Sequence, residues 1–206
     1  MQKGIDAHDN AEKYIKGLTP TLSPVLHGLK SELDRMRKMF KAKKLPMIVE
    51  DNWAFDVNWE ESEWNNWAEC WVRIKLDAAH YETPTELFVT DWKTGKPNEY
   101  KNTEYMEQME LYALSALLLA LRDDVRVRVR LGYVETGDII VPRDKTGEEI
   151  VYDKSMLPTL MKTWNARVKP MMSDTTFPPR PNNECKWCFY GQAGKATKGG
   201  PGLCKY

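Results

Sequence analysis

Apolar residues recur at helical spacing before Pro46 and predict two helices in that part of the chain. The first helix covers residues 4–16 and places His8 and Glu12 near one face. The second covers residues 23–44 and is amphipathic. Its apolar positions are Leu26, Leu29, Leu33, Met36 and Phe40.

Short apolar runs after Pro46 predict strands over residues 47–50, 67–79 and 87–91. The pair Thr83-Pro84 predicts a turn between the last two, which makes them a hairpin. The run 87–91 is apolar until its polar end, as in a buried central strand.

The second half of the chain begins with its clearest helical pattern, residues 102–121, which contain no Gly or Pro. Residues 125–134 alternate strictly, with arginine on one face, and predict a half-buried strand. Residues 139–141 are expected to pair with that strand through the turn at 136–138. Residues 154–171 predict a last helix, and a loop held by cysteines follows Pro178.

This order of elements is neither a regular βαβ alternation nor an all-β pattern. It predicts an α/β fold of the mixed α+β kind, in which helices flank a central mixed β-sheet. A length of 206 residues suits one domain with a small appendage. We expect the domain to cover residues 1–178 and a cysteine-containing C-terminal loop to cover residues 179–206.

Composition and charge argue against two classes of function. Thirty basic and thirty acidic residues give a formal net charge of zero, which argues against coating nucleic acid by bulk charge. The longest apolar run, residues 113–121, is too short to span a bilayer, and no charged-then-apolar signal peptide opens the chain. We therefore expect an intracellular protein with no membrane partner.

Five of the eight tryptophans fall between residues 53 and 71. Two interpretations are open for them: packing in and around the core, or a platform on which unpaired nucleobases stack. They are Trp53, Trp59, Trp64, Trp67 and Trp71.

Two carboxylates carry the candidate chemistry. Asp77 and Asp91 each follow an apolar run, and we place both at the ends of adjacent strands, where they can bind a hard cation such as Mg²⁺ or Mn²⁺. Lys93 lies two positions after Asp91, so both side chains point to one face of the strand. An ammonium there can orient a metal-bound water and stabilise charge growing on a phosphate.

Other residues fall in an order that supports this site. His8 on the first helix can complete a metal sphere, and Gln108 and Tyr112 share one helix face at a spacing of four residues. A tight turn, Thr94-Gly95-Lys96, follows Lys93 directly.

Together these motifs resemble the RecB-type branch of the PD-(D/E)XK nuclease superfamily. The matching pattern is Gly4-x3-His8-x3-Glu12, Asp77, Asp91-Trp-Lys93-Thr-Gly-Lys96 and Gln108-x3-Tyr112. It is similar to phage-encoded exonucleases and to CRISPR-associated exonucleases that carry an iron–sulfur cluster. The resemblance implies a restriction-endonuclease-like core. One departure is Ile74-Lys75-Leu76, where many relatives have a glycine before the aspartate.

The resemblance also assigns roles. It implies that His8, Asp77 and Asp91 bind metal, with the backbone carbonyl of Trp92 as a further ligand. It makes Lys93 the catalytic lysine, and it uses Gln108 and Tyr112 to position the lysine, the water or the DNA. Glu50, on the preceding strand, is an additional candidate acid.

Three of the four cysteines gather near the C-terminus as Cys185-x2-Cys188-x15-Cys204. Three thiolates with this spacing favour Zn²⁺ or a [4Fe–4S] cluster, each of which needs a fourth ligand; three unliganded thiols are the alternative. In the cluster-bearing relatives the fourth cysteine comes from an N-terminal element that precedes the Gly/His motif, and three residues precede Gly4 in this sequence. Cys70 is expected to pack inside a strand.

The resulting expectation is a Mg²⁺- or Mn²⁺-dependent deoxyribonuclease, specifically an exonuclease in phage-type recombination, replication or repair. Its partners would be single- or double-stranded DNA and phage or host recombination proteins, in the cytoplasm of a bacterial host if the chain is phage-encoded. The row Arg126, Arg128 and Arg130 either contacts the DNA backbone or forms a solvated sheet face. A catalytically inactive DNA-binding module and an RNA-processing enzyme are the alternatives.

Overall fold

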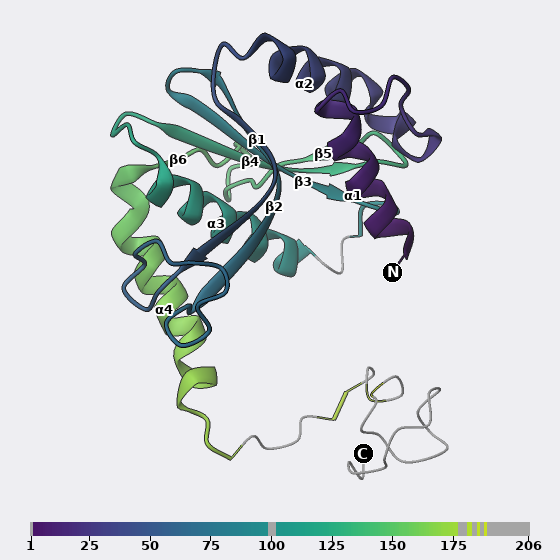
Figure 1. Cartoon of the computed structure of the whole chain (residues 1–206). Coiled ribbons are helices and arrows are strands. Elements are labelled where there is room, and N and C mark those ends of the chain that lie inside the picture. Colours follow the sequence, from purple (N-terminus) through teal and green to yellow (C-terminus); the bar gives the residue numbers. More distant parts are fainter. Residues whose placement is uncertain (1, 99–101, 177–180, 183–184, 186–187, 189–206) are drawn as a thin grey trace. The chain divides into compact units, whose positions relative to one another are not determined.

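A computed structural model describes residues 2–98, 102–176, 181–182, 185 and 188 of the chain (Figure 1). The chain divides into two compact units, Met1–Asn165 and Ala166–Tyr206. The elements are α1 (Gln2–Ile15), η1 (Pro24–Leu29), α2 (Lys30–Ala42), β1 (Met47–Phe55), β2 (Val72–Thr83), β3 (Glu86–Lys93), α3 (Asn102–Leu119), β4 (Arg126–Tyr133), β5 (Ile139–Ile140), β6 (Tyr152–Asp153), η3 (Lys154–Met156) and α4 (Leu157–Ser173).

One sheet organises the first unit. Its strands follow the order β1-β2-β3-β4-β5, and β6 pairs with β4 off this path. β1, β2 and β3 form an antiparallel meander, whereas β3 and β4 are parallel because α3 carries the chain back between them. The predicted mixed sheet flanked by helices is confirmed, and it is the arrangement expected of a restriction-endonuclease-like core.

Helices cover both faces of the sheet (Figure 1). On one face, α1 and α2 bury a cluster that includes Leu33, Val49 and Trp92. On the other face, α3 and the first part of α4 pack through residues such as Leu117 and Leu160 against β2, β3 and β4. Burial of apolar surface on both faces is the main stabilising contribution to this three-layer arrangement.

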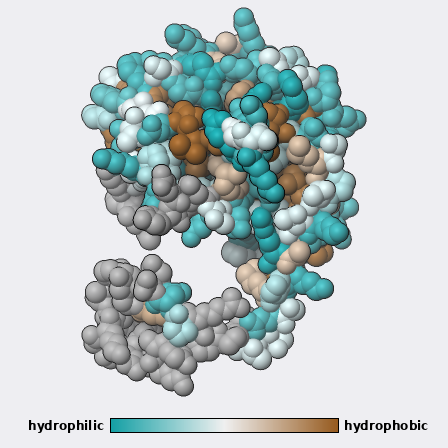
Figure 2. Space-filling model, turned by 180° about the vertical axis from the view of Figure 1, so that it is seen from behind, coloured by the Kyte–Doolittle hydropathy of each residue, from teal (hydrophilic) through white to brown (hydrophobic). Residues whose placement is uncertain are grey.

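The surface is largely polar. Seen from behind, hydrophobic residues reach the surface in small patches among hydrophilic ones (Figure 2). Among the described residues, no helix is both long enough and apolar enough to cross a membrane.

Residues 23–44 do not form the single helix that their apolar spacing predicts. A 3-10 helix, η1, precedes α2, with Pro24 among its first residues. Gly28 in η1 lies against the end of β4, so that an added Cβ would lie 2.5 Å from the carbonyl oxygen of Val134. This close approach to β4 determines the path of the backbone through η1. The spacing of apolar residues along the segment contains no information about such a contact with another element.

The strand predicted over residues 67–79 is displaced along the chain. Cys70 lies in a turn, where its N–H donates to the Asn66 carbonyl at 2.8 Å, so its predicted place inside a strand is wrong. β2 begins only at Val72, after the Trp71 N–H donates to the carbonyl of Phe55 at 2.8 Å. β1 likewise continues from Met47 to Phe55, beyond the predicted residue 50.

Each of the three arginines in the β4 row forms an ion pair with a carboxylate. Arg126 pairs with Glu86 at 2.9 Å, and Arg128 pairs with Glu149 at 2.8 Å. The guanidinium of Arg130 pairs with Glu32 of α2, and its side chain is only 13% exposed. A solvated face is therefore the wrong description at Arg130. Contact of the row with DNA stays a prediction, and it would require displacing these carboxylates.

His80 is fully buried beside this arginine network, and it gives stability a specific pH dependence. Its Nε2 accepts a hydrogen bond from Arg35 at 3.2 Å. Burial, and then the charges of Arg130 and Arg35, lower the pKa of His80 from 6.5 to about 4. The unfolded chain therefore binds a proton between pH 6.5 and 4 that the folded chain excludes, so stability falls as the pH falls through that window.

We expect wild type to lose about 2 kcal/mol more unfolding free energy than His80→Gln between pH 7 and pH 5. Urea denaturation of both proteins at the two pH values measures this difference. Equal losses in the two proteins would show that His80 is not the group responsible.

Candidate active site

The candidate site lies where β2 and β3 part. Their pairing ends at Ala78 and Thr90, so the next residues, Asp77 and Asp91, lie side by side at the fork. Beyond this point β2 stays paired with β1, and β3 stays paired with β4. The prediction that both aspartates lie at strand ends is wrong for Asp77, which is inside β2: it is the β2–β3 pairing that ends there.

Asp91 is held from three sides. The ammonium of Lys93 lies 2.7 Å from Asp91 Oδ2 and donates to Gln108 Oε1 at 2.8 Å. The Tyr112 hydroxyl donates to Asp91 Oδ1 at 2.8 Å, and Gln108 Nε2 lies 3.2 Å from the same oxygen. Gln108 and Tyr112 reach it together because they are one helical turn apart on α3. The orientation of Asp91 is thus fixed by hydrogen bonds.

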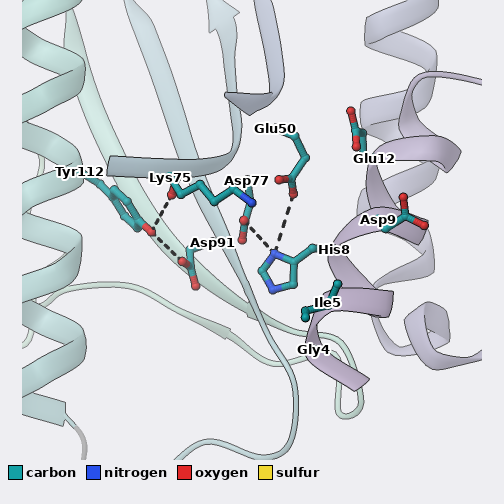
Figure 3. A pocket seen from close by; sticks show the side chains of 10 residues that line it. All are labelled: Gly4, Ile5, His8, Asp9, Glu12, Glu50, Lys75, Asp77, Asp91 and Tyr112. Atoms are coloured by element: carbon teal, nitrogen blue, oxygen red, sulfur yellow. Dashed lines mark hydrogen bonds and ion pairs between the residues drawn. The ribbon is translucent and has the colours of Figure 1, made fainter. Parts of the chain in front are cut away.

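Asp77 faces α1 instead. Its Oδ2 accepts the backbone N–H of Trp92 at 2.6 Å, and its Oδ1 lies 2.8 Å from His8 Nδ1. Glu50 approaches the same imidazole nitrogen at 3.9 Å (Figure 3). Ligand atoms of His8, Glu50 and Asp77 all lie within 4.8 Å of one another. Three elements, α1, β1 and β2, therefore bring one imidazole and two carboxylates to one point.

Glu50 has an unusual backbone for its residue type. Its φ is +52°, in the left-handed region that non-glycine residues rarely adopt. Its two neighbours on β1 pair with Ala78 and Leu76 of β2. Glu50 therefore lies opposite Asp77. Its buried Oε1 has no hydrogen-bond partner among the described residues. Backbone strain and an unpartnered carboxylate oxygen are features that cluster at functional sites.

The site carries excess negative charge. Burial, and then the charge of Asp77, raise the pKa of Asp91 and of Glu50. The hydrogen bond to Asp77 raises the pKa of His8. Burial is the larger cause for the two carboxylates and the neighbouring negative charge of Asp77 adds to it, so both effects disfavour their ionised forms. A divalent cation at this point would provide the charge that Lys93 alone does not.

The site opens into a cavity of about 480 Å³ at the N-terminal end of α1 (Figure 3). Acidic side chains of β1, β2 and β3 line one part of it, and α1 lines another. The lining residues are Gly4, Ile5, His8, Asp9, Glu12, Glu50, Lys75, Asp77, Asp91 and Tyr112.

The structure therefore brings seven residues singled out in the sequence to one fork: His8, Glu50, Asp77, Asp91, Lys93, Gln108 and Tyr112. Trp92 joins them through its backbone N–H, and a role for its carbonyl stays a prediction. Sequence reasoning left Lys75 unassigned, although it stands two positions before Asp77 and lines the same cavity.

The C-terminal cysteines belong to the second compact unit. The Cys188 N–H donates to the Cys185 carbonyl at 3.2 Å, and the Asn182 N–H donates to Cys185 Sγ at 3.2 Å. The two thiols therefore stand at a tight turn. Cys204 lies outside the described residues.

A family model described as the PD-(D/E)XK nuclease superfamily matches residues 3–193. No curated protein matches the chain.

Proposed function

The chain belongs to the PD-(D/E)XK nuclease superfamily, and we propose that it is a Mg²⁺- or Mn²⁺-dependent deoxyribonuclease that hydrolyses phosphodiester bonds. Membership of a nuclease family makes nucleic acid its substrate class. The observation that supports the proposal most strongly is the fork itself. Three carboxylates and one imidazole converge there beside a lysine that is held in place.

The donor set fits a hard divalent cation. Carboxylate oxygens are the ligands that Mg²⁺ and Mn²⁺ prefer, and an imidazole is compatible with Mn²⁺. His8, Asp77 and Asp91 would hold the ion, and Glu50, with its unpartnered oxygen, is a further ligand in this proposal. When bound, the ion would polarise a phosphoryl oxygen and lower the pKa of an attacking water.

Lys93 supplies positive charge next to that position. Its ammonium is fixed between Asp91 and Gln108, so it can donate a hydrogen bond to a water or phosphate oxygen without first being ordered. Gln108 and Tyr112 act through Asp91 and Lys93, because their hydrogen bonds keep the carboxylate and the ammonium aligned. They are positioning residues in this scheme.

The order of the motifs supports a finer assignment to the RecB-type branch. From this likeness we propose exonuclease action in phage-type recombination, replication or repair, on single- or double-stranded DNA and alongside recombination proteins. The nuclease domain would cover residues 1–178, and residues 179–206 would carry the cysteine site.

Cys185 and Cys188 are proposed as ligands of Zn²⁺ or a [4Fe–4S] cluster together with Cys204. Their turn supports this, because the Asn182 N–H already donates to Cys185 Sγ and would stabilise a thiolate there. Iron and zinc analysis of the purified full chain distinguishes the two metals, and a chain with neither would contradict the proposal.

The nuclease proposal is tested with end-labelled single-stranded DNA, duplex DNA and RNA of one sequence. We expect the full chain to cleave DNA with Mn²⁺ or Mg²⁺, to stop in excess chelator and to resume when metal is restored. Tight DNA binding without cleavage in either metal would favour an inactive DNA-binding module. Cleavage of RNA in preference to DNA would overturn the deoxyribonuclease assignment while leaving a nuclease.

A further inference from the structure

Upstream of Asp77, the outward side chains of β2 change from acidic to basic. Ile74 and Leu76 are buried in the core, and the alternation of a strand turns Arg73 and Lys75 to its other face. On β1, Asn52 is the cross-strand neighbour of Lys75. The outer face of the β1–β2 ribbon thus leads from the carboxylates of the fork to two cations.

Lys75 is the cation nearest the site. It is exposed and lines the same cavity as His8 and Asp77, and its side chain extends along the cavity toward Asp77 and Glu50 (Figure 3). Its ammonium makes no hydrogen bond or ion pair with any residue that the structure describes. Lys93, by contrast, is engaged by Asp91 and Gln108. The charge of Lys75 acts on the nearby Glu50 carboxylate, but its N–H donors remain available for a ligand.

Arg73, two positions further from the site, is stacked on indole rings. Its guanidinium carbon lies 3.2 Å from the ring centroid of Trp67 and 5.2 Å from that of Trp64. Arg73 Nε contacts Cys70 Sγ at 3.4 Å, which holds the guanidinium in place. Trp67 is nevertheless 78% exposed, so most of the indole that Arg73 supports is open to solvent.

We propose that Lys75, Arg73 and Trp67 form a binding track for one unpaired strand of DNA next to the scissile phosphate. Lys75 contacts a backbone phosphate, and Trp67, supported from beneath by Arg73, stacks on an unpaired base. The track rests on the proposed nuclease function and deepens it, because it names the substrate as a single strand or a frayed end.

Two arguments favour an unpaired strand over an intact duplex. An indole can stack only on a base whose face is free, and such stacking tolerates any sequence. The track is also short and continuous with the site: Arg73 and Asp77 are four positions apart on one strand, roughly 13 Å. The arginines of β4, by comparison, are already paired with Glu86, Glu149 and Glu32.

Binding of labelled DNA to the full chain in excess chelator tests the track without cleavage. The probes are a fluorescein-labelled oligothymidylate and a fluorescein-labelled, covalently closed circular duplex, which has neither ends nor unpaired loops. We expect Trp67→Ala to weaken oligothymidylate binding at least about fivefold, while duplex binding changes less than about twofold. Trp67→Phe should restore most of the affinity, because a phenyl ring can also stack.

Lys75→Ala should lower the slope of log Kd against log salt for the single strand by about 0.7, the value for one phosphate contact. The matched controls are Lys41→Ala, an exposed lysine of α2, and Leu121→Ala, an exposed apolar residue, which should leave both probes bound as in wild type. Circular dichroism melts verify that each exposed-site variant is folded.

Equal loss of single-strand and duplex affinity in Trp67→Ala would overturn the track. So would single-strand binding by Trp67→Ala within twofold of wild type, together with an unchanged salt slope in Lys75→Ala. Mn²⁺-dependent cleavage by wild type is measured separately. If wild type cleaves DNA and the track variants bind single-stranded DNA like wild type, the track is wrong and the nuclease function stands. If wild type cleaves no DNA, the nuclease function itself fails.

Discussion

Lys93→Ala is expected to slow phosphodiester cleavage on the order of 100- to 1,000-fold, the cost of removing one preorganised charged donor from an active site. The ammonium of Lys93 lies 2.7 Å from Asp91 and is held by Gln108 at 2.8 Å, so it is fixed beside the carboxylate before substrate arrives. No other described ammonium contacts Asp91. Single-turnover cleavage of end-labelled DNA at saturating Mn²⁺ measures the effect on the chemical step.

The matched control is Lys41→Ala, an exposed lysine of α2 outside the site, which should cleave at the wild-type rate. Lys93→Arg keeps the charge but replaces a compact ammonium with a planar fork, so we expect it to recover only part of the rate. A Lys93→Ala protein that cleaves as fast as Lys41→Ala would remove Lys93 from the mechanism.

Asp77→Asn is expected to weaken Mn²⁺ binding on the order of 100-fold or more, and to shift metal-dependent cleavage to correspondingly higher Mn²⁺ concentrations. The amide oxygen can still accept the Trp92 N–H, whose present distance to Asp77 is 2.6 Å. The substitution therefore preserves the local backbone while removing one negative charge from the ligand group with His8 and Glu50. Calorimetric titration with Mn²⁺ measures the loss directly.

Thermal stability supplies an independent readout of the same change. Wild type should melt higher when Mn²⁺ is added, since a ligand that binds only the folded chain stabilises it by about 2.7 kcal/mol at 100 times Kd. Asp77→Asn should show little of this shift. The control is Asp9→Asn, which lines the same cavity but pairs with Lys13 and lies outside the ligand group, and it should keep the wild-type shift. If Asp77→Asn bound Mn²⁺ like wild type, the ligand assignment would be wrong.

Much of the site could be predicted because local patterns determine it. Two apolar runs joined by a Thr83-Pro84 turn must form adjacent strands, which brings Asp77 beside Asp91. The spacing of Gln108 and Tyr112 places both on one face of α3, and the structure shows both side chains at Asp91. These relations follow from the periods of strand and helix.

Features that depend on contacts distant in sequence could not be predicted. The arginine row of β4 alternates like a solvent-facing edge, yet Arg130 is covered by α2 and paired with Glu32, 98 residues away. The positive φ of Glu50 likewise arises where β1 passes the fork, and no pattern within residues 47–50 encodes it. The 3-10 turn at Gly28 depends on its approach to Val134.

The most direct measurement is a Mn²⁺ titration of DNA cleavage by wild type, Asp77→Asn and Lys93→Ala side by side. Wild type should cleave only with metal. Asp77→Asn should require far more Mn²⁺, whereas Lys93→Ala should reach a lower maximal rate at a Mn²⁺ requirement closer to that of wild type. Cleavage that survives excess chelator, or three identical titration curves, would contradict a metal-dependent active site at the β2–β3 fork.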